Sequence, residues 1–188
     1  MNPWITIWTN PTKTIDSLMG THWAESFGFI PFILFGINSV GVRLILIPNL
    51  SLTYGIIFTI FAGTVLGILA SIIWVNIIFL IGKIWKGQAT RENIRLVLSL
   101  CHMPEIFRFV NFIGSMIANR NNLNNVAINE VLTLVCIILG FRIIVIGLSR
   151  IQKYSFGLAV LNIFLPQLII SVLYLSIKGL WKLKLRIS

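Results

Sequence analysis

Residues 52–82 read LTYGIIFTIFAGTVLGILASIIWVNIIFLIG, and this stretch contains no charged side chain. A helix of about 20 apolar residues crosses the roughly 30 Å hydrocarbon core of a bilayer. A run of this length therefore predicts one membrane-spanning helix with room to tilt. A helix on the surface of a soluble protein keeps a polar face, and this stretch has none.

Small residues recur at every fourth position of this stretch. Positions four apart lie on one ridge of a helix. Lipid gives helices no hydrophobic drive to associate, so they meet where small side chains let the backbones approach. We predict that this helix-packing ridge docks against another helix, either of this chain or of a second copy. The ridge consists of Gly55, Thr59, Gly63, Gly67 and Ser71.

The composition predicts an all-α, polytopic helical membrane protein. The 188 residues are 57% hydrophobic and only 11% charged, whereas soluble domains carry about 25% charged residues. We expect a transmembrane domain over 27–188, with about five spans near 27–46, 52–82, 96–118, 128–148 and 156–180. Residues 1–26 are expected to form short interfacial helices, because Asn-Pro pairs at 2–3 and 10–11 are helix-start signals. Trp4 and Trp8 are the predicted interfacial anchors.

The charge is strongly basic, with 15 Lys and Arg against five acidic residues and a net charge of +10. The bases lie mostly near span ends, where they attract anionic lipid headgroups. No aromatic and basic platform for nucleic acid accompanies them. The expected partners are membrane lipids and, in addition, a membrane-protein partner or a second copy, but not nucleic acid. The predicted headgroup residues are Lys83, Lys86, Arg91, Arg95, Lys178, Lys182, Lys184 and Arg186.

Charge counting leaves two topologies open. The loop at 83–95 holds four bases and one acid, which is typical of a cytoplasmic loop. With five spans and a cytoplasmic N-terminus, the basic C-terminal tail lies outside. The numbers of basic residues on the two sides of the membrane are then nearly equal. If 96–118 only dips into the membrane and returns, the tail lies inside, and the positive-inside rule is satisfied better.

Charged side chains within the spans are the strongest sign of a functional site. Residues 96–118 contain His102, Glu105 and Arg108, and Arg142 lies within the span at 128–148. An ionisable residue inside a membrane is a functional hypothesis by default. Glu105 would pair with Arg108 or Arg142 and titrate, with His102 as a relay, beside a helix opened by Pro104. The alternative is that this helix lies partly at the interface, with its charges reaching headgroups or forming one structural pair.

Catalysis and metal binding find no support in the motifs. The chain has no GxSxG or HExxH sequence. Its two histidines and two cysteines lack metal-ligand spacing. We therefore predict a protein that is not an enzyme and has no cofactor or metal. Polar residues within the spans are expected to form interhelical hydrogen bonds, namely Asn38, Asn76, Asn111, Asn162 and Gln167.

Four segments, taken in order, resemble the Yip domain family, named for the Ypt-interacting proteins. They are the opening NPWITIW with Pro11 and 14–15, the Gly/Lys loop at 82–96, the helix at 98–104 that leads to a proline, and GLSRIQK at 147–153 followed by Ser155, Ala159 and Pro166. The resemblance implies a five-span fold with a cytoplasmic N-terminus. Together with the short N-terminal tail, it implies an integral protein of the bacterial cytoplasmic (inner) membrane.

Two functions follow as hypotheses. The first is a non-enzymatic membrane scaffold or adaptor of the Yip type, which works through helix packing and lipid contacts. The second is a small transporter, channel or lipid-handling protein with a polar cavity around Glu105. The packing ridge and the tryptophans favour the first, and the polar stretch at 96–118 favours the second.

Overall fold

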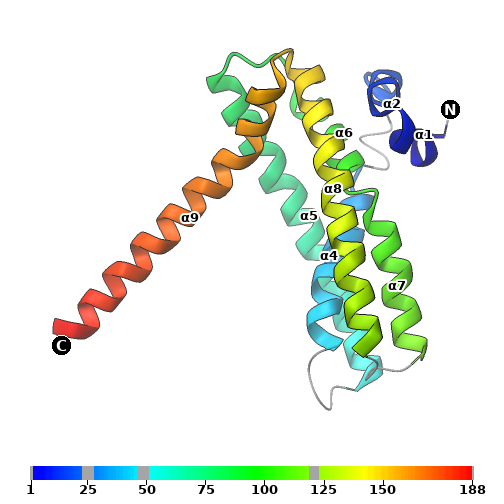
Figure 1. Cartoon of the computed structure of the whole chain (residues 1–188), viewed down its shortest axis with the longest axis vertical. Helices are drawn as coiled ribbons and strands as arrows, with labels where there is room; N and C mark the ends of the chain where they lie inside the picture. The colour runs from blue at the N-terminus through cyan, green and yellow to red at the C-terminus, as the bar shows by residue number, and fades with distance from the viewer. Residues whose placement is uncertain (1, 23–27, 46–50, 119–122, 188) are drawn as a thin grey trace.

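The structure is a computed structural model that describes residues 2–22, 28–45, 51–118 and 123–187. All regular secondary structure in these residues is α-helical. The helices are α1 (Pro3–Thr9), α2 (Pro11–Leu18), α4 (Ile30–Ile45), α5 (Leu52–Ile84), α6 (Arg91–Cys101), α7 (Glu105–Ala118), α8 (Leu123–Gln152) and α9 (Phe156–Ile187). Figure 1 shows α4, α5, α7 and α8 side by side, with α9 leaning away from them toward the C-terminus.

Three helices of the described chain are long and apolar enough to cross a membrane, over Thr53–Ile84, Glu130–Gln152 and Phe156–Ser176. The bent pair α6–α7 makes a fourth if it counts as one span. The described residues therefore contain three or four such helices, fewer than the five spans that the sequence predicts. The span predicted at 27–46 corresponds to α4, whose apolar part, Ile30–Gly41, is shorter than a bilayer requires.

Large apolar side chains cover the outer surfaces of the three long helices. Such a surface is unusual for a soluble protein and typical of one surrounded by lipid. Exposed examples are Tyr54, Phe58 and Phe61 on α5, Val131 and Ile138 on α8, and Leu168 and Val172 on α9.

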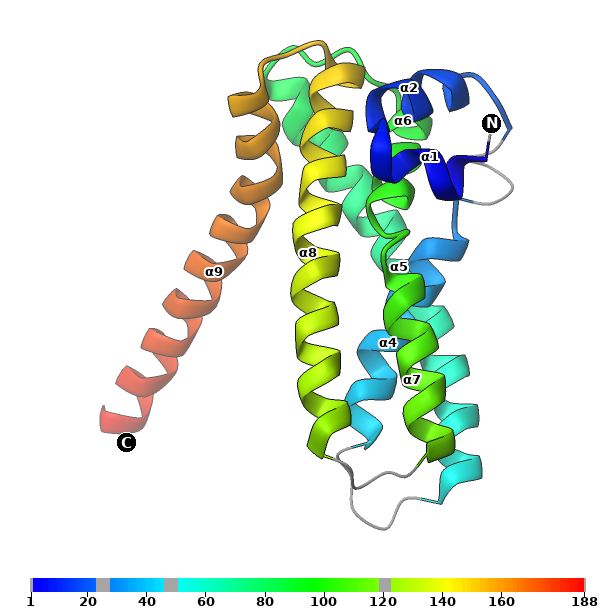
Figure 2. The ribbon, with the colours of Figure 1, turned by 45° about the vertical axis from the view of Figure 1, so that its right-hand side comes forward.

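The stretch predicted as one helix at 96–118 is broken into α6 and α7, which meet at a bend of 44°. Pro104 has no N–H to continue the helix, and turn bonds such as Met103 N–H to Leu100 O take over across the break. Both halves nevertheless run antiparallel along α8. Gly147 faces Val97 and Gly140 faces Cys101, while the Cys136 thiol donates to Pro104 O at 3.1 Å. The pair therefore continues in one direction instead of doubling back (Figure 2).

The helix-packing ridge of α5 faces α4 of the same chain. All five of its residues are buried. A methyl group added at Gly63 would lie 2.5 Å from Ile37 Cα, and one at Gly67 would lie 2.8 Å from Ile33 Cα. Gly36 contributes to the same contact from α4. Only residues without a side chain permit two backbones to come this close.

The two N-terminal helices begin at the Asn-Pro pairs. The Asn2 side chain accepts from Trp4 N–H and the Asn10 side chain accepts from Lys13 N–H, each at 3.1 Å. Ile7 and Ile15 are fully buried in the core. Asp16 of α2 accepts two hydrogen bonds from the Arg150 guanidinium, at 3.0 and 3.1 Å. The helices thus dock on the end of the bundle where α8 ends (Figure 2).

We expect Gly63→Ala to destabilise the protein by about 1–3 kcal/mol, because the added methyl forces α4 away from α5. Gly114→Ala is the matched control, since a methyl there meets nothing within 4 Å. Alanine is also a better helix former than glycine. Thermal unfolding of both variants in detergent checks this. Equal melting temperatures would contradict the close approach of the two helices.

Candidate functional site

The break between α6 and α7 positions a buried carboxylate. Glu105 is the first residue of α7, and the positive end of the helix dipole favours an acidic side chain there. Helix α4 approaches the same point from the other side. A chain break that would otherwise weaken the helix thus creates a place for a charge inside the bundle.

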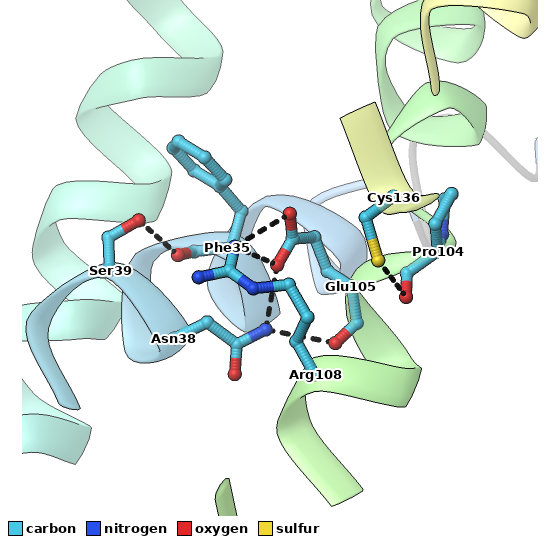
Figure 3. A network of polar contacts seen from close by, with 7 residues as sticks. All are labelled: Phe35, Asn38, Ser39, Pro104, Glu105, Arg108 and Cys136. Atoms are coloured by element: carbon cyan, nitrogen blue, oxygen red, sulfur yellow. Dashed lines mark hydrogen bonds and ion pairs between the residues drawn. The ribbon is translucent and has the colours of Figure 1, made fainter. Parts of the chain in front are cut away.

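Asn38 and Arg108 hold the Glu105 carboxylate (Figure 3). Asn38 Nδ2 donates to Glu105 Oε2 at 2.8 Å and to the Glu105 carbonyl at 2.9 Å. Arg108 Nη1 lies 3.1 Å from Oε1 and 2.9 Å from Oε2. The Arg108 and Glu105 side chains are only 11% and 9% exposed. The positive charge of Arg108 therefore balances the negative charge of the carboxylate, and three hydrogen-bonding contacts to side chains from two helices hold the carboxylate in place.

Glu105 also faces a cavity of about 310 Å³ that lies among α4, α5, α6, α8 and α9. Most of the wall is apolar, with Trp74 and Ile78 from α5, Ile137 and Phe141 from α8, and Ile163 from α9. The lining also includes the polar or thiol side chains of Cys101, His102, Glu105, Cys136 and Gln167. The cavity thus has a long apolar wall and a small polar part, most of which lies near the helix break.

His102 lies in the cavity wall between two aromatic rings. Its ring centroid is 4.8 Å from that of Phe32 and 4.7 Å from that of Phe35. Within the described residues, no hydrogen bond joins the imidazole to the Glu105 carboxylate. His102 therefore shares the cavity with Glu105 but belongs to an aromatic cluster.

Arg142 does not join the predicted polar cluster. Its side chain is exposed on α8 and Nη1 donates to the Trp8 carbonyl at 3.4 Å. This carbonyl lies at the C-terminal end of α1, where the helix dipole favours a cation. The Trp8 ring packs on Phe107 with centroids 5.6 Å apart, and Trp4 packs against the core. Both predicted anchors therefore contact the bundle.

The predicted headgroup residues divide between the two ends of the molecule. Lys83, Lys86 and Arg91 are exposed at the connection between α5 and α6, and the half-buried Arg95 lies 5.2 Å from the Phe29 ring centroid. Lys178 is exposed on α9, 5.9 Å from the Tyr174 ring centroid. The side chains of Lys182, Lys184 and Arg186 lie outside the described residues.

Among the residues that the structure describes, no group of three His, Cys, Asp or Glu side chains is placed to hold a metal ion.

Gln152, part of the GLSRIQK segment, has a structural role that the sequence did not indicate. Its Oε1 accepts from Ala89 N–H at 3.2 Å, and its carbonyl accepts from Gln88 N–H at 3.3 Å. A methyl at Gly82 or Gly87 would collide with its side chain. The end of α8 is thereby attached to the connection between α5 and α6.

The hydroxyl of Tyr154, just beyond this junction, makes a 2.6 Å hydrogen bond with Asn162 Nδ2. Burial raises the pKa of the Tyr154 phenol above its ordinary range. Ser149 Oγ donates to the Tyr154 carbonyl at 2.8 Å. The segment at 147–153 that carries part of the family resemblance is thus a tightly packed junction between helices.

Comparison of the chain with protein-family models, curated proteins and solved structures finds no match in any of the three. The resemblance to the Yip domain family therefore rests on the four sequence segments alone.

We expect Arg108→Met to destabilise the protein by about 3 kcal/mol, because it leaves the Glu105 carboxylate buried without its cation. The double variant Glu105→Gln, Arg108→Met removes both charges and should recover most of that loss. Arg142→Met is the control, as this arginine is exposed. Chemical or thermal unfolding of the wild type, the two single variants Arg108→Met and Glu105→Gln, and the double variant gives the coupling energy. A loss for Arg108→Met no larger than for Arg142→Met would contradict a buried ion pair.

Proposed function

We propose that the protein is a non-enzymatic, multi-pass membrane protein that binds a small amphipathic molecule in the cavity beside Glu105. The observation that carries this proposal is the combination of an apolar wall with one fixed carboxylate at a helix break. Broken helices at membrane depth occur where they line a cavity or are buried in protein. The function is therefore of the lipid-handling or transport class.

The cavity volume supports a ligand of modest size. Small-molecule sites are mostly apolar, have a few polar groups that fix orientation, and begin at about 300 Å³. Trp74, Phe141 and Ile163 would contact the apolar part of the ligand. Glu105 would accept a hydrogen bond from its head group, because Asn38 and Arg108 already hold the carboxylate in one orientation. A preorganised acceptor loses little entropy when a ligand binds.

A scaffold or adaptor of the Yip type is the second candidate. The packing ridge is covered by α4, and the N-terminal tryptophans pack on their own bundle. The ridge and the tryptophans, which favoured a scaffold, therefore make contacts within this chain. The observation that still favours it is the exposed apolar surface of α9, which includes Ile169, Val172 and Leu175.

For the topology, we propose five passes made by α4, α5, α6–α7, α8 and α9, which alternate in direction (Figure 2). Helix α4 would cross with the help of local bilayer thinning. The bases Lys13, Lys83, Lys86 and Arg91 gather at the end where α1 and α2 lie, which supports a cytoplasmic position for this end.

Ile137→Trp should fill the mouth of the cavity and displace the bound molecule. Ile138→Trp is the matched control, since the two side chains are adjacent and 61% and 59% exposed, but only Ile137 lines the cavity. The protein is extracted in native-lipid nanodiscs and analysed by native mass spectrometry. We expect a small molecule of defined mass on the wild type and on the control, and its loss from Ile137→Trp.

The same experiment separates the two functions. A second polypeptide at fixed stoichiometry, with no small molecule that responds to Ile137→Trp, would overturn the binding proposal and support a scaffold. Retention of the small molecule by Ile137→Trp would place its site elsewhere.

Five passes predict that the two chain termini lie on opposite sides of the membrane. A reporter that is active only in the cytoplasm is fused in turn to each end of the full chain. We expect activity from the N-terminal fusion and none from the C-terminal one. Activity from both fusions, each expressed at the same level, would contradict the five-pass arrangement.

A further inference from the structure

A second candidate site lies outside the cavity, at the end of the bundle where α5 passes into α6. A surface groove there is lined by Phe79 and Lys83 of α5 and by 88–92, which lead into α6. Two cations converge on one aromatic ring within it. Lys83 Nζ lies 5.3 Å and Arg91 Cζ lies 5.0 Å from the centroid of Phe79.

Neither of the two cations forms an ion pair with a residue that the structure describes. They contact the same ring, so their charges lie at most about 10 Å apart, a distance comparable to the screening length of about 8 Å in physiological salt. Glu92 lines the same groove. Lys83 Nζ donates to the Gly87 carbonyl at 3.3 Å. An anion in the groove would relieve the repulsion between them and satisfy their remaining donors.

The surroundings favour a lipid as the source of that anion. Lys83 lies at the last turn of the apolar α5 segment Thr53–Ile84, the depth at which a span reaches the headgroups. Leu80 and Ile84, its neighbours on α5, are 60% and 71% exposed and offer an apolar surface for an acyl chain. A soluble anion would gain nothing from these two side chains.

We propose that Phe79, Lys83 and Arg91 form a binding site for the phosphate of an anionic phospholipid, with the acyl chains lying along Leu80 and Ile84. The aromatic ring orders both cations before the lipid arrives, which lowers the entropic cost of binding. The site uses none of the residues that line the cavity beside Glu105, so its failure would leave the proposed function untouched, and the reverse also holds.

The test is a titration of the purified full chain in detergent with phosphatidylglycerol or phosphatidylcholine, read by native mass spectrometry. The variant Lys83→Gln, Arg91→Gln removes both groove cations. The control Lys13→Gln, Lys153→Gln removes two exposed bases from the same end of the molecule. We expect the wild type and the control to prefer phosphatidylglycerol and the groove variant to bind it about 20-fold more weakly.

A conservative variant guards against misfolding. Lys83→Arg, Arg91→Lys keeps both charges and should retain most of the preference for phosphatidylglycerol. Equal weakening by the groove and control variants would show general charge attraction and overturn the proposal, as would the absence of any preference in the wild type. Competition by inorganic phosphate or glycerol phosphate at concentrations equal to the lipid would identify a soluble anion instead of a lipid.

Discussion

The backbone contact between α4 and α5 is the constraint on which the rest of the bundle depends. Gly36, Gly63 and Gly67 let the two helices approach more closely than any side chain would permit. Helix α4 then has its opposite surface available for α7, where Gly41 accommodates the Phe112 ring and Asn38 reaches Glu105. Because α4 lies between two neighbours, a shift at its glycine contact would also move the amide that holds the buried carboxylate.

The polar network at the helix break is not fully satisfied. Asn38 Oδ1 and Arg108 Nε are buried without a hydrogen-bond partner among the described residues. Each such atom costs about 1–3 kcal/mol, and replacing a buried ion pair with apolar residues is often neutral or stabilising. Stability alone therefore gives little reason to keep Glu105 and Arg108 at this depth. A role for the carboxylate at the cavity surface accounts for the cost better than a purely structural one.

Local sequence patterns were sufficient for part of this structure. The Asn-Pro pairs gave the starts of α1 and α2, and the every-fourth-residue pattern gave the surface of α5 that α4 covers. The break at 102–104 was harder, because the apolar pattern continues through it and Pro104 alone does not fix whether a helix bends. The pairing of Glu105 with Arg108, three positions along the chain, could be predicted. The contacts of Asn38 with Glu105 and of Trp8 with Arg142 depend on which helices become neighbours, and residues 67 and 134 positions apart carry no mutual signal in one sequence.

The docking of α1 and α2 on α8 has a consequence for how the protein is made. Asp16 meets Arg150 across 134 positions of sequence. The first two helices leave the ribosome long before their binding surface exists, and at 5–20 residues per second the interval is roughly 7–27 s. During that time Ile15, which is fully buried in the folded protein, does not yet have its contact near Gly147 on α8. Until α8 has been made, this apolar side chain must be shielded from water by another surface. The nearest such surface is the headgroup layer of the bilayer.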